Sequence, residues 1–335
     1  MVLRYSPFLA DALRLTKRLK PLRVLNLLLI KGGFWLSRIT GKVIVLGRPF
    51  SVSAEAAGIC NLKCPECIVG RRQTKRQEKM IDFDIFTSIL ERHKSHGFYM
   101  NLYFQGEPFL NKNLEGLIAE ASRAGFYTSV STNGHYLDEN RCREIVHSGL
   151  DRLIVSLDGL DQETYSFYRR GGNWERVVRG IEAMAKVRQD EKARNPLIVV
   201  QFLVNRKNES QIKPLKQFAR QVGADIIELK SMQVYDHWGA DVFLPASGRF
   251  NRYLSWQNGK PKLARKGKGP CQRLWSHAVY TSDGIQVSCC YDKVPEHAMG
   301  KILGEDPWFS PEMNAFRKRV IERRDDTGIC CNCSE

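Results

Sequence analysis

The chain has 335 residues, 43% of them hydrophobic, which is ordinary for a globular protein and excludes a largely disordered chain. Its length allows one large domain plus a small one. The net charge of +16 would suit nucleic-acid binding, but no helix-turn-helix, zinc-finger or RNA-recognition signature is present, so we expect no nucleic-acid partner.

Residues 1–48 form a basic amphipathic extension. Residues 1–50 hold ten lysines and arginines against one acid, Asp11, a net +9. Leucines alternate with these cations, and the uncharged apolar run 24–30 is too short to span a bilayer. Such a segment suits a helix on an anionic membrane surface, a helix packed on the protein's own core, or a contact with a partner. A mitochondrial presequence is a further alternative, although no linker follows the extension.

A cysteine loop comes next, reading Gly-Ile-Cys-Asn-Leu-Lys-Cys-Pro-Glu-Cys over residues 58–67. Cys60, Cys64 and Cys67 can hold three irons of a 4Fe–4S cube and leave the fourth iron without a protein ligand. Structural zinc is the alternative, but it takes four ligands, usually as two separated pairs. The spacing therefore favours an iron–sulfur cluster with one open position.

Residues 49–232 alternate between apolar strands and amphipathic helices. The predicted strands are 50–57, 98–104, 126–131, 152–157, 197–204 and 225–231, and the predicted helices are 82–95, 111–124, 138–148, 161–188 with a break at Gly171, and 208–222. This order predicts an α/β fold with a parallel sheet and right-handed crossovers. Ligands of such sheets bind at the carboxyl ends of the strands, where the cysteine loop lies.

Polar motifs follow the other strands. They are 105–108 with Glu107, 131–134 with Thr132 and Asn133, 156–159 with Ser156 and Asp158, and 168–172 with Arg169. Each motif alone reads as an ordinary turn. Together they indicate a binding site, because they occur in order along the chain and each stands at the end of a predicted strand.

Together, the loop and motifs resemble the radical S-adenosylmethionine (radical SAM) enzymes over roughly residues 50–232. Two positions depart from the family pattern, Glu66 where an aromatic residue is usual and Gln105 where glycine is usual. The resemblance implies a partial (β/α)6 TIM-like barrel. It also implies that SAM chelates the open iron and is cleaved reductively to methionine and a 5′-deoxyadenosyl radical.

The resemblance also assigns the cofactor contacts. Glu107 would bind the amino group of SAM, Thr132 and Asn133 the ribose, and Ser156 the carboxylate or ribose. Asp158 belongs to the same cofactor site. Arg169, or Arg170 in its place, would pair with the SAM carboxylate, a role that suits the bidentate guanidinium.

Residues 233–270 are expected to be a linker or lid, and 271–335 a second unit. Cys271, Cys289, Cys330 and Cys333 make a complete four-thiolate set, which zinc would also accept, with Cys290 and Cys331 available as substitutes. The hairpin 280–287 joins the first two cysteines. The spacing Cys271-x12-Gly284-x4-Cys289 resembles the SPASM/twitch extension of radical SAM enzymes, whose hairpin and helix carry auxiliary 4Fe–4S clusters. The one-cluster twitch form fits better, because few spare thiols are present.

The resemblance implies a radical SAM oxidoreductase. We expect oxidation (dehydrogenation) or epimerisation of a small-molecule, sugar or lipid-linked substrate, with flavodoxin or ferredoxin as the electron donor. No cleavable signal peptide is recognisable, so we expect a reducing cytoplasm, with peripheral contact at the inner face of the membrane through the extension.

Three other functions stay open. They are a SPASM-type peptide maturase, for which the extension is too short to supply a peptide-binding winged helix, a non-catalytic two-cluster electron-transfer protein, and a zinc-structured binding module. The candidates for substrate contact or proton handling are Asp236, His237, Asp283 and Asp292. Each of these is more often a turn residue.

Overall fold

The computed structural model describes residues 7–74, 77–235, 237–257, 260–264 and 269–334. Its centre is a curved sheet in the order β11-β10-β9-β1-β2-β3-β4-β5-β6. Six strands belong to the predicted series: β1 (Ser51–Ala54), β2 (Tyr99–Asn101), β3 (Tyr127–Thr132), β4 (Arg152–Ser156), β5 (Leu197–Val204) and β6 (Ile226–Ser231). They pair in parallel throughout, so their carboxyl ends meet at one edge.

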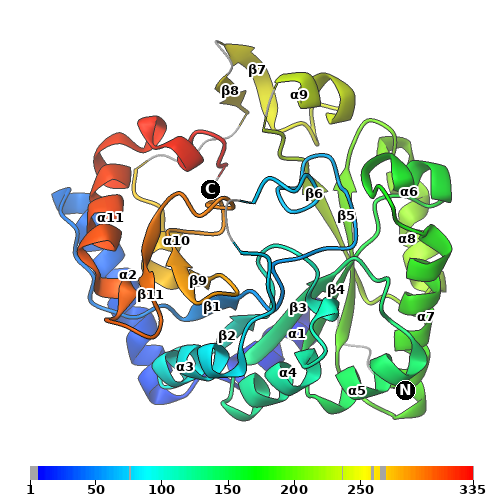
Figure 1. Ribbon diagram of the computed structural model, residues 1–335, viewed down its shortest axis with the longest axis horizontal. Helices are drawn as coiled ribbons and strands as arrows, with labels where there is room; N and C mark the ends of the chain where they lie inside the picture. The colour runs from blue at the N-terminus through cyan, green and yellow to red at the C-terminus, as the bar shows by residue number, and fades with distance from the viewer. Residues whose placement is uncertain (1–6, 75–76, 236, 258–259, 265–268, 335) are drawn as a thin grey trace.

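Helices cover the outer face of this sheet (Figure 1). They are α3 (Phe83–His93), α4 (Leu114–Arg123), α5 (Glu139–His147), α6 (Gln162–Tyr168), α7 (Trp174–Asp190) and α8 (Ile212–Gln221). Side chains of Asp138, Asp161 and Asn173 accept the first-turn amides of α5, α6 and α7, as good N-caps do. Asp82 stands at the N-cap of α3 without capping it, and pairs instead with Lys79 at 3.0 Å.

The predicted α/β class and partial barrel are confirmed. Each predicted strand and helix of the series is present, and Gly171 breaks the long helical run at φ +82°, a conformation that glycine adopts readily. The sheet also contains three strands beyond the predicted six, and these come from the C-terminal unit.

The C-terminal strands are β9 (His277–Tyr280), β10 (Ile285–Val287) and β11 (Ala298–Lys301), with helices α10 (Arg273–Ser276) and α11 (Pro311–Arg323) beside them. The predicted hairpin is formed by β9 and β10. However, β9 pairs in parallel with β1, so the hairpin continues the barrel sheet. Between the two parts, α9 (His237–Phe243) precedes a small separate ribbon of β7 (Tyr253–Gln257) and β8 (Lys260–Leu263).

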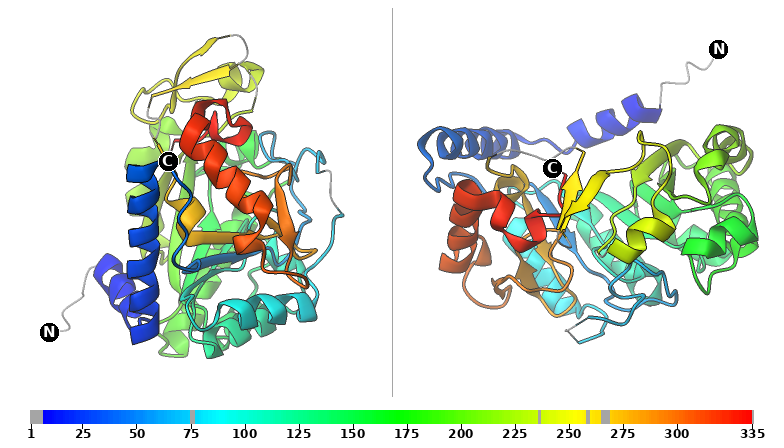
Figure 2. Two further views of the ribbon diagram at one scale, coloured as in Figure 1. Left: turned by 90° about the vertical axis from the view of Figure 1, so that its left-hand side faces the viewer. Right: turned by 90° about the horizontal axis from the view of Figure 1, so that it is seen from above.

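The N-terminal extension forms α1 (Pro7–Thr16) and α2 (Pro21–Thr40), which lie along one face of the molecule (Figure 2). Asp11 of α1 bonds to Tyr127 and Arg152, the first residues of β3 and β4. Asn26 of α2 donates to the carbonyl of Arg48, which precedes β1. The two helices therefore cover the amino ends of the strands. Among the described residues, no helix is both long enough and apolar enough to cross a membrane.

A buried arginine fixes α2 to the barrel. The guanidinium of Arg23 donates to the carbonyls of Lys94 (2.9 Å), Ala124 (3.3 Å) and Gly125 (2.7 Å). These carbonyls lie just past the ends of α3 and α4, where helix carbonyls lack internal partners and a cation is favourable. Burial, together with the nearby Arg18, lowers the pKa of Arg23.

Replacing Arg23 by methionine should lower the free energy of unfolding by about 2–4 kcal/mol, because several buried carbonyls lose their donor. Urea unfolding of the anaerobic protein measures this. The matched control is Arg38→Met on the exposed side of α2, which should change stability by less than about 0.5 kcal/mol. Equal losses in both variants would contradict the role given to Arg23.

Candidate active site

A cavity of about 310 Å³ lies at the carboxyl ends of the strands. Its lining includes most of the predicted site: Cys60, Cys64, Cys67, Glu107, Thr132, Asn133, Ser156 and Arg169. It also includes Gln201 and Lys293, which sequence reasoning did not select. Seven separate segments of the chain therefore contribute to one chamber of a size that suits a small ligand.

Close backbone contact holds the cysteine loop against the end of β2. The amide of Glu107 donates to the carbonyl of Ile59 at 2.7 Å. Gly106, at φ +71°, lies so close that a Cβ there would come within 2.3 Å of the carbonyl oxygen of Ala57. Only glycine fits this position. On the other side of the loop, the amide of Lys63 donates to the carbonyl of Arg170.

The carboxylate of Glu107 is fully buried and joins two motifs. Oε1 accepts from the amide of Phe109 and the hydroxyl of Thr132, and Oε2 accepts from the amide of Asn133. A carboxylate offers about four acceptor positions, so about one is left for a ligand. Burial raises the pKa of Glu107, while the bonds from Asn133, Thr132 and Phe109 oppose that rise.

Asn133 orients the cysteine loop. Its side-chain Nδ2 donates to Oδ1 of Asn61 at 2.8 Å, and its Oδ1 accepts from the backbone and the ring of His135. The other ring nitrogen of His135 accepts from the amide of Asn173 at 2.8 Å. His135 is thus a positioning residue that the sequence did not reveal, because its partner Asn173 lies far away along the chain.

Arg169 and Asp158 form a buried ion pair beside the thiols. Nε of Arg169 lies 2.5 Å from Oδ2 of Asp158, and the other carboxylate oxygen accepts from the amide of Leu203 at 2.7 Å. Burial alone would lower the pKa of the guanidinium, but Asp158 and Cys64 raise it well above its usual value. Asp158 does not line the cavity, so it acts by holding Arg169.

The thiols of the loop lie close to one another in a poorly solvated place. Burial raises the pKa of Cys60 to about 12 and that of Cys64 to about 11, and the neighbouring thiols add to both shifts. Such thiols ionise only when positive charge is supplied, as a metal centre does. Within the described residues, no three His, Cys, Asp or Glu side chains converge tightly enough to hold a single metal ion. A four-iron cube holds its thiolates further apart than one ion does.

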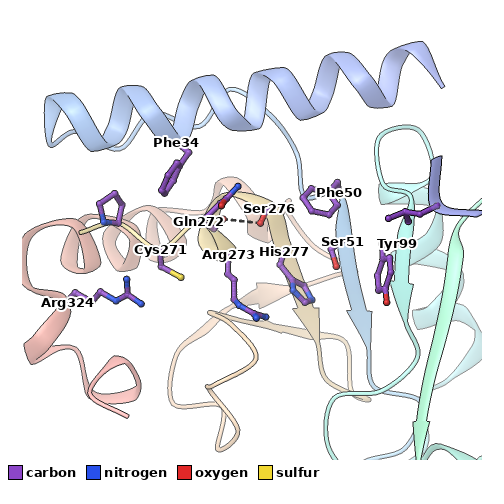
Figure 3. Close-up of a pocket in the computed structure, with 12 residues that line it drawn as sticks. Phe34, Phe50, Ser51, Tyr99, Cys271, Gln272, Arg273, Ser276, His277 and Arg324 are labelled. Carbon is purple, nitrogen blue, oxygen red and sulfur yellow. Dashed lines mark hydrogen bonds between the residues drawn. The ribbon is translucent and has the colours of Figure 1, made fainter. Parts of the chain in front are cut away.

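A second group of thiols gathers in the C-terminal unit. Burial is the largest cause of the raised pKa of Cys271, Cys289 and Cys330. Neighbouring thiols add to it, since Cys333 raises the pKa of Cys271 and Cys330, and Cys271 raises that of Cys289 and Cys330. Cys271 also borders a cavity of about 650 Å³ beneath α2, whose lining includes Arg273 and Arg324 (Figure 3).

The two spare thiols differ in their surroundings. Cys290 accepts from the guanidinium of Arg273 at 3.5 Å, whereas Cys331 donates to the backbone carbonyl of Asp325 at 2.9 Å. A neighbouring cation favours a thiolate, and of the two spare thiols only Cys290 accepts a bond from a guanidinium among the described residues.

Of the four candidates for proton handling, the structure describes the side chains of Asp283 and Asp292, and neither lines the cavity. Asp292 is fully buried and accepts from Ser288 and from the amides of Glu296 and His297, which makes it a turn-former. Asp283 accepts from Thr281 within the hairpin turn. Asp236 lies outside the described residues, and His237 begins α9 without a described side chain.

Besides Gln201 and His135, sequence reasoning missed two further residues, Lys293 and Glu55. Lys293 brings a cation from the C-terminal unit into the cavity wall, where Nζ donates to Gln233 at 3.2 Å and lies 5.1 Å from the ring centre of Tyr235. Burial lowers its pKa. Glu55, just after β1, accepts from the amides of Gln105 and Ser282 and so joins the barrel to the hairpin. No motif marks either residue.

Comparisons with known proteins agree with this geometry. Residues 55–218 match the family model described as the radical SAM superfamily. PqqA peptide cyclase of Gluconobacter oxydans is 28% identical over 315 residues, covering 85% of this chain and 86% of that protein. A tungsten-containing aldehyde ferredoxin oxidoreductase cofactor-modifying protein of Pyrococcus furiosus is 25% identical over 184 residues, covering 53% and 50%.

Solved structures share the fold. BtrN in complex with AdoMet and 2-DOIA has a TM-score of 0.55 at 18% identity, covering 86% of this chain and 94% of that one. Streptococcus suis SuiB bound to S-adenosylmethionine has a TM-score of 0.62 at 13% identity, covering 91% and 76%. Native anSMEcpe with bound AdoMet has a TM-score of 0.58 at 14% identity, covering 85% and 88%. At these identities the likeness concerns the fold alone.

Replacing Asp158 by asparagine should lower the free energy of unfolding by about 3 kcal/mol, because it leaves the buried guanidinium of Arg169 unpaired. The double variant Asp158→Asn/Arg169→Met should recover part of that loss in a double-mutant cycle measured by urea unfolding. Breaking the exposed Lys207–Glu163 pair with Lys207→Gln is the control, and it should leave the stability unchanged because solvent screens this pair. Strictly additive losses would contradict a coupled pair.

Proposed function

Because this chain belongs to the radical SAM superfamily, we propose that it oxidises its substrate after removing a hydrogen atom from one of the substrate's C–H bonds. One observation carries the proposal. The three thiols of the cysteine loop share a single cavity with Glu107 and Arg169, an acid and a base suited to the two charged ends of an amino acid.

The family's cofactors are a 4Fe–4S cluster and SAM, which when bound supply a carbon radical by reductive cleavage of SAM. Cys60, Cys64 and Cys67 would hold the cluster. The unused acceptor position on Glu107 would take the SAM ammonium, and the guanidinium of Arg169 would take its carboxylate.

The remaining cavity residues divide into contacts and supports. Ser156 and Gln201 are neighbours in the pairing of β4 with β5, and we assign their side chains to the carboxylate or ribose of SAM. Thr132 and Asn133 are predicted ribose contacts, and they also orient Glu107 and the cysteine loop through the bonds described above. Asp158 supports Arg169.

The C-terminal thiols would hold an auxiliary 4Fe–4S cluster through Cys271, Cys289, Cys330 and Cys333. The burial of these thiols, and the rise in pKa that neighbouring thiols add at Cys271, Cys289 and Cys330, support this assignment. A second cluster would provide an electron acceptor inside the protein, which suits net oxidation. We take flavodoxin or ferredoxin as the external electron donor. We propose that the protein is located in the reducing cytoplasm, at the inner face of the membrane.

The substrate we propose is a small molecule, sugar or lipid-linked compound that is dehydrogenated or epimerised. Lys293 in the cavity wall favours a substrate with an anionic group, such as a phosphate or carboxylate. A peptide substrate is the second candidate. It is favoured by the likeness to PqqA peptide cyclase, which extends over 85% of this chain.

Anaerobic reconstitution with iron and sulfide should give about eight irons per chain, and dithionite with SAM should then yield 5′-deoxyadenosine. The variant Cys271→Ala/Cys330→Ala should retain about four irons and still form 5′-deoxyadenosine. The variant Cys60→Ala/Cys64→Ala/Cys67→Ala should retain about four irons and form none.

The same assay separates the competing functions. Full clusters without any 5′-deoxyadenosine would contradict radical catalysis and favour an electron-transfer protein. Four irons in the wild-type chain, with zinc in the C-terminal unit, would contradict the auxiliary cluster and the oxidative role given to it.

Replacing Glu107 by glutamine should weaken SAM binding about 10- to 100-fold, because the ammonium loses a charge-assisted hydrogen bond of about 1.5–3 kcal/mol. Equilibrium dialysis on the cluster-loaded protein measures this. The control Glu91→Gln alters an exposed carboxylate on α3 that pairs with Lys94, and its SAM affinity should equal that of the wild type. Unchanged affinity in Glu107→Gln would overturn the assigned contact.

A further inference from the structure

The outer helix α2 packs with its polar side inward. Arg23, Asn26 and Ser37 are buried against the barrel, and each makes defined hydrogen bonds there. Asn26 bonds to both the carbonyl and the amide of Arg48, at 2.9 and 2.8 Å, and Ser37 accepts from the amide of Ile44 at 2.9 Å. The buried side of a surface helix is usually apolar. Here polar bonds supply much of the attachment, with Ile30 and Phe34 beside them.

The apolar side of α2 faces outward. Ile39 is 77% exposed, Leu28 63%, Leu22 55% and Trp35 53%. The full exposed set is Leu22, Val24, Leu25, Leu28, Leu29, Trp35, Leu36 and Ile39. At about 100° per residue these positions fall within a sector of roughly 160°, so they form one continuous stripe along the helix. An exposed apolar surface this long marks an interaction site.

The position of α2 on the outside of the molecule makes the apolar stripe accessible. In both views of Figure 2, α2 and α1 lie along the same face of the molecule, with their outer sides turned away from the barrel. Leu9 and Leu13 of α1 are also exposed. The stripe, named here the outer face of α2, is therefore available to a broad, flat partner.

The charges beside the stripe are all positive. Lys20, Lys31 and Arg38 are exposed, and their angular positions place them together along one edge of the stripe. Arg38 lies 5.2 Å from the ring centre of Trp35. Helix α2 contains no acid, and Asp11, the one acid of the extension, pairs inward with Arg152. Protein interfaces usually have rims of mixed polarity, whereas an aliphatic stripe with a tryptophan and a cationic edge suits anionic lipid.

We propose that the outer face of α2 binds the surface of an anionic lipid bilayer, with the leucines among the acyl chains and Lys20, Lys31 and Arg38 among the headgroups. This inference is independent of the chemistry proposed for the cavity. It also sets an orientation, because α2 covers the amino ends of the strands and the cavity lies at their carboxyl ends. The barrel then separates the cavity from the lipid, and the cavity faces the aqueous side.

Sedimentation of the full-length, cluster-loaded protein with vesicles tests the proposal. Vesicles that contain phosphatidylglycerol should carry the protein down, and vesicles of phosphatidylcholine alone should carry about tenfold less. Raising the salt from about 0.05 to 0.5 M should release it. The variant Leu25→Ser/Leu28→Ser/Leu36→Ser should lose binding about tenfold or more, and Lys20→Gln/Lys31→Gln/Arg38→Gln should lose the preference for phosphatidylglycerol.

The matched control is Leu254→Ser/Leu303→Ser, which removes two exposed leucines elsewhere on the surface and should bind vesicles as the wild type does. All variants should form 5′-deoxyadenosine at the wild-type rate, which shows that they are folded. Absence of wild-type binding to phosphatidylglycerol at low salt would overturn the proposal. So would a wild-type dimer that the leucine variant converts to a monomer, since the outer face would then bind a second copy.

Discussion

Buried carboxylates at the strand ends hold the cavity together. Glu55 after β1, Glu107 after β2 and Asp158 after β4 are each fully buried, and each accepts a backbone amide from another segment. A carboxylate without partners is very costly to bury, so each one constrains the loops that supply its donors. These bonds fix the places of Gln105 and Leu203 in the cavity wall and of Ser282 in the hairpin, although the three lie far apart in the chain.

Such a wall explains why several predicted contacts have two roles. Thr132 and Asn133 were expected to touch ribose, yet both already bond to Glu107. Asp158 was grouped with the cofactor contacts, yet it supports Arg169 from outside the cavity. In a preorganised site, residues that position others are as constrained as those that touch the ligand.

The sequence was most informative where short-range physics decides the structure. Strand and helix periodicity located the six core strands, and the polar motifs were found because parallel strands place their ends together. Lys293 and Glu55 could not be found in this way. The pairing of β9 with β1 brings Lys293 to the cavity and brings the hairpin to Glu55. Local periodicity predicts a strand but does not predict which strand it pairs with, and β9 is more than 200 residues from β1 in the sequence.

The same limit applies to α2. Its periodicity showed an amphipathic helix, but could not show which side faces the barrel, because the buried polar side depends on carbonyls from α3, α4 and the segment before β1. The contacts of α2 lie at the amino ends of the strands, whereas the cavity lies at their carboxyl ends. Under the proposed membrane binding, a substrate would present its reacting carbon to a cavity that faces water, and the cation of Lys293 in that cavity suits a polar headgroup better than an acyl chain.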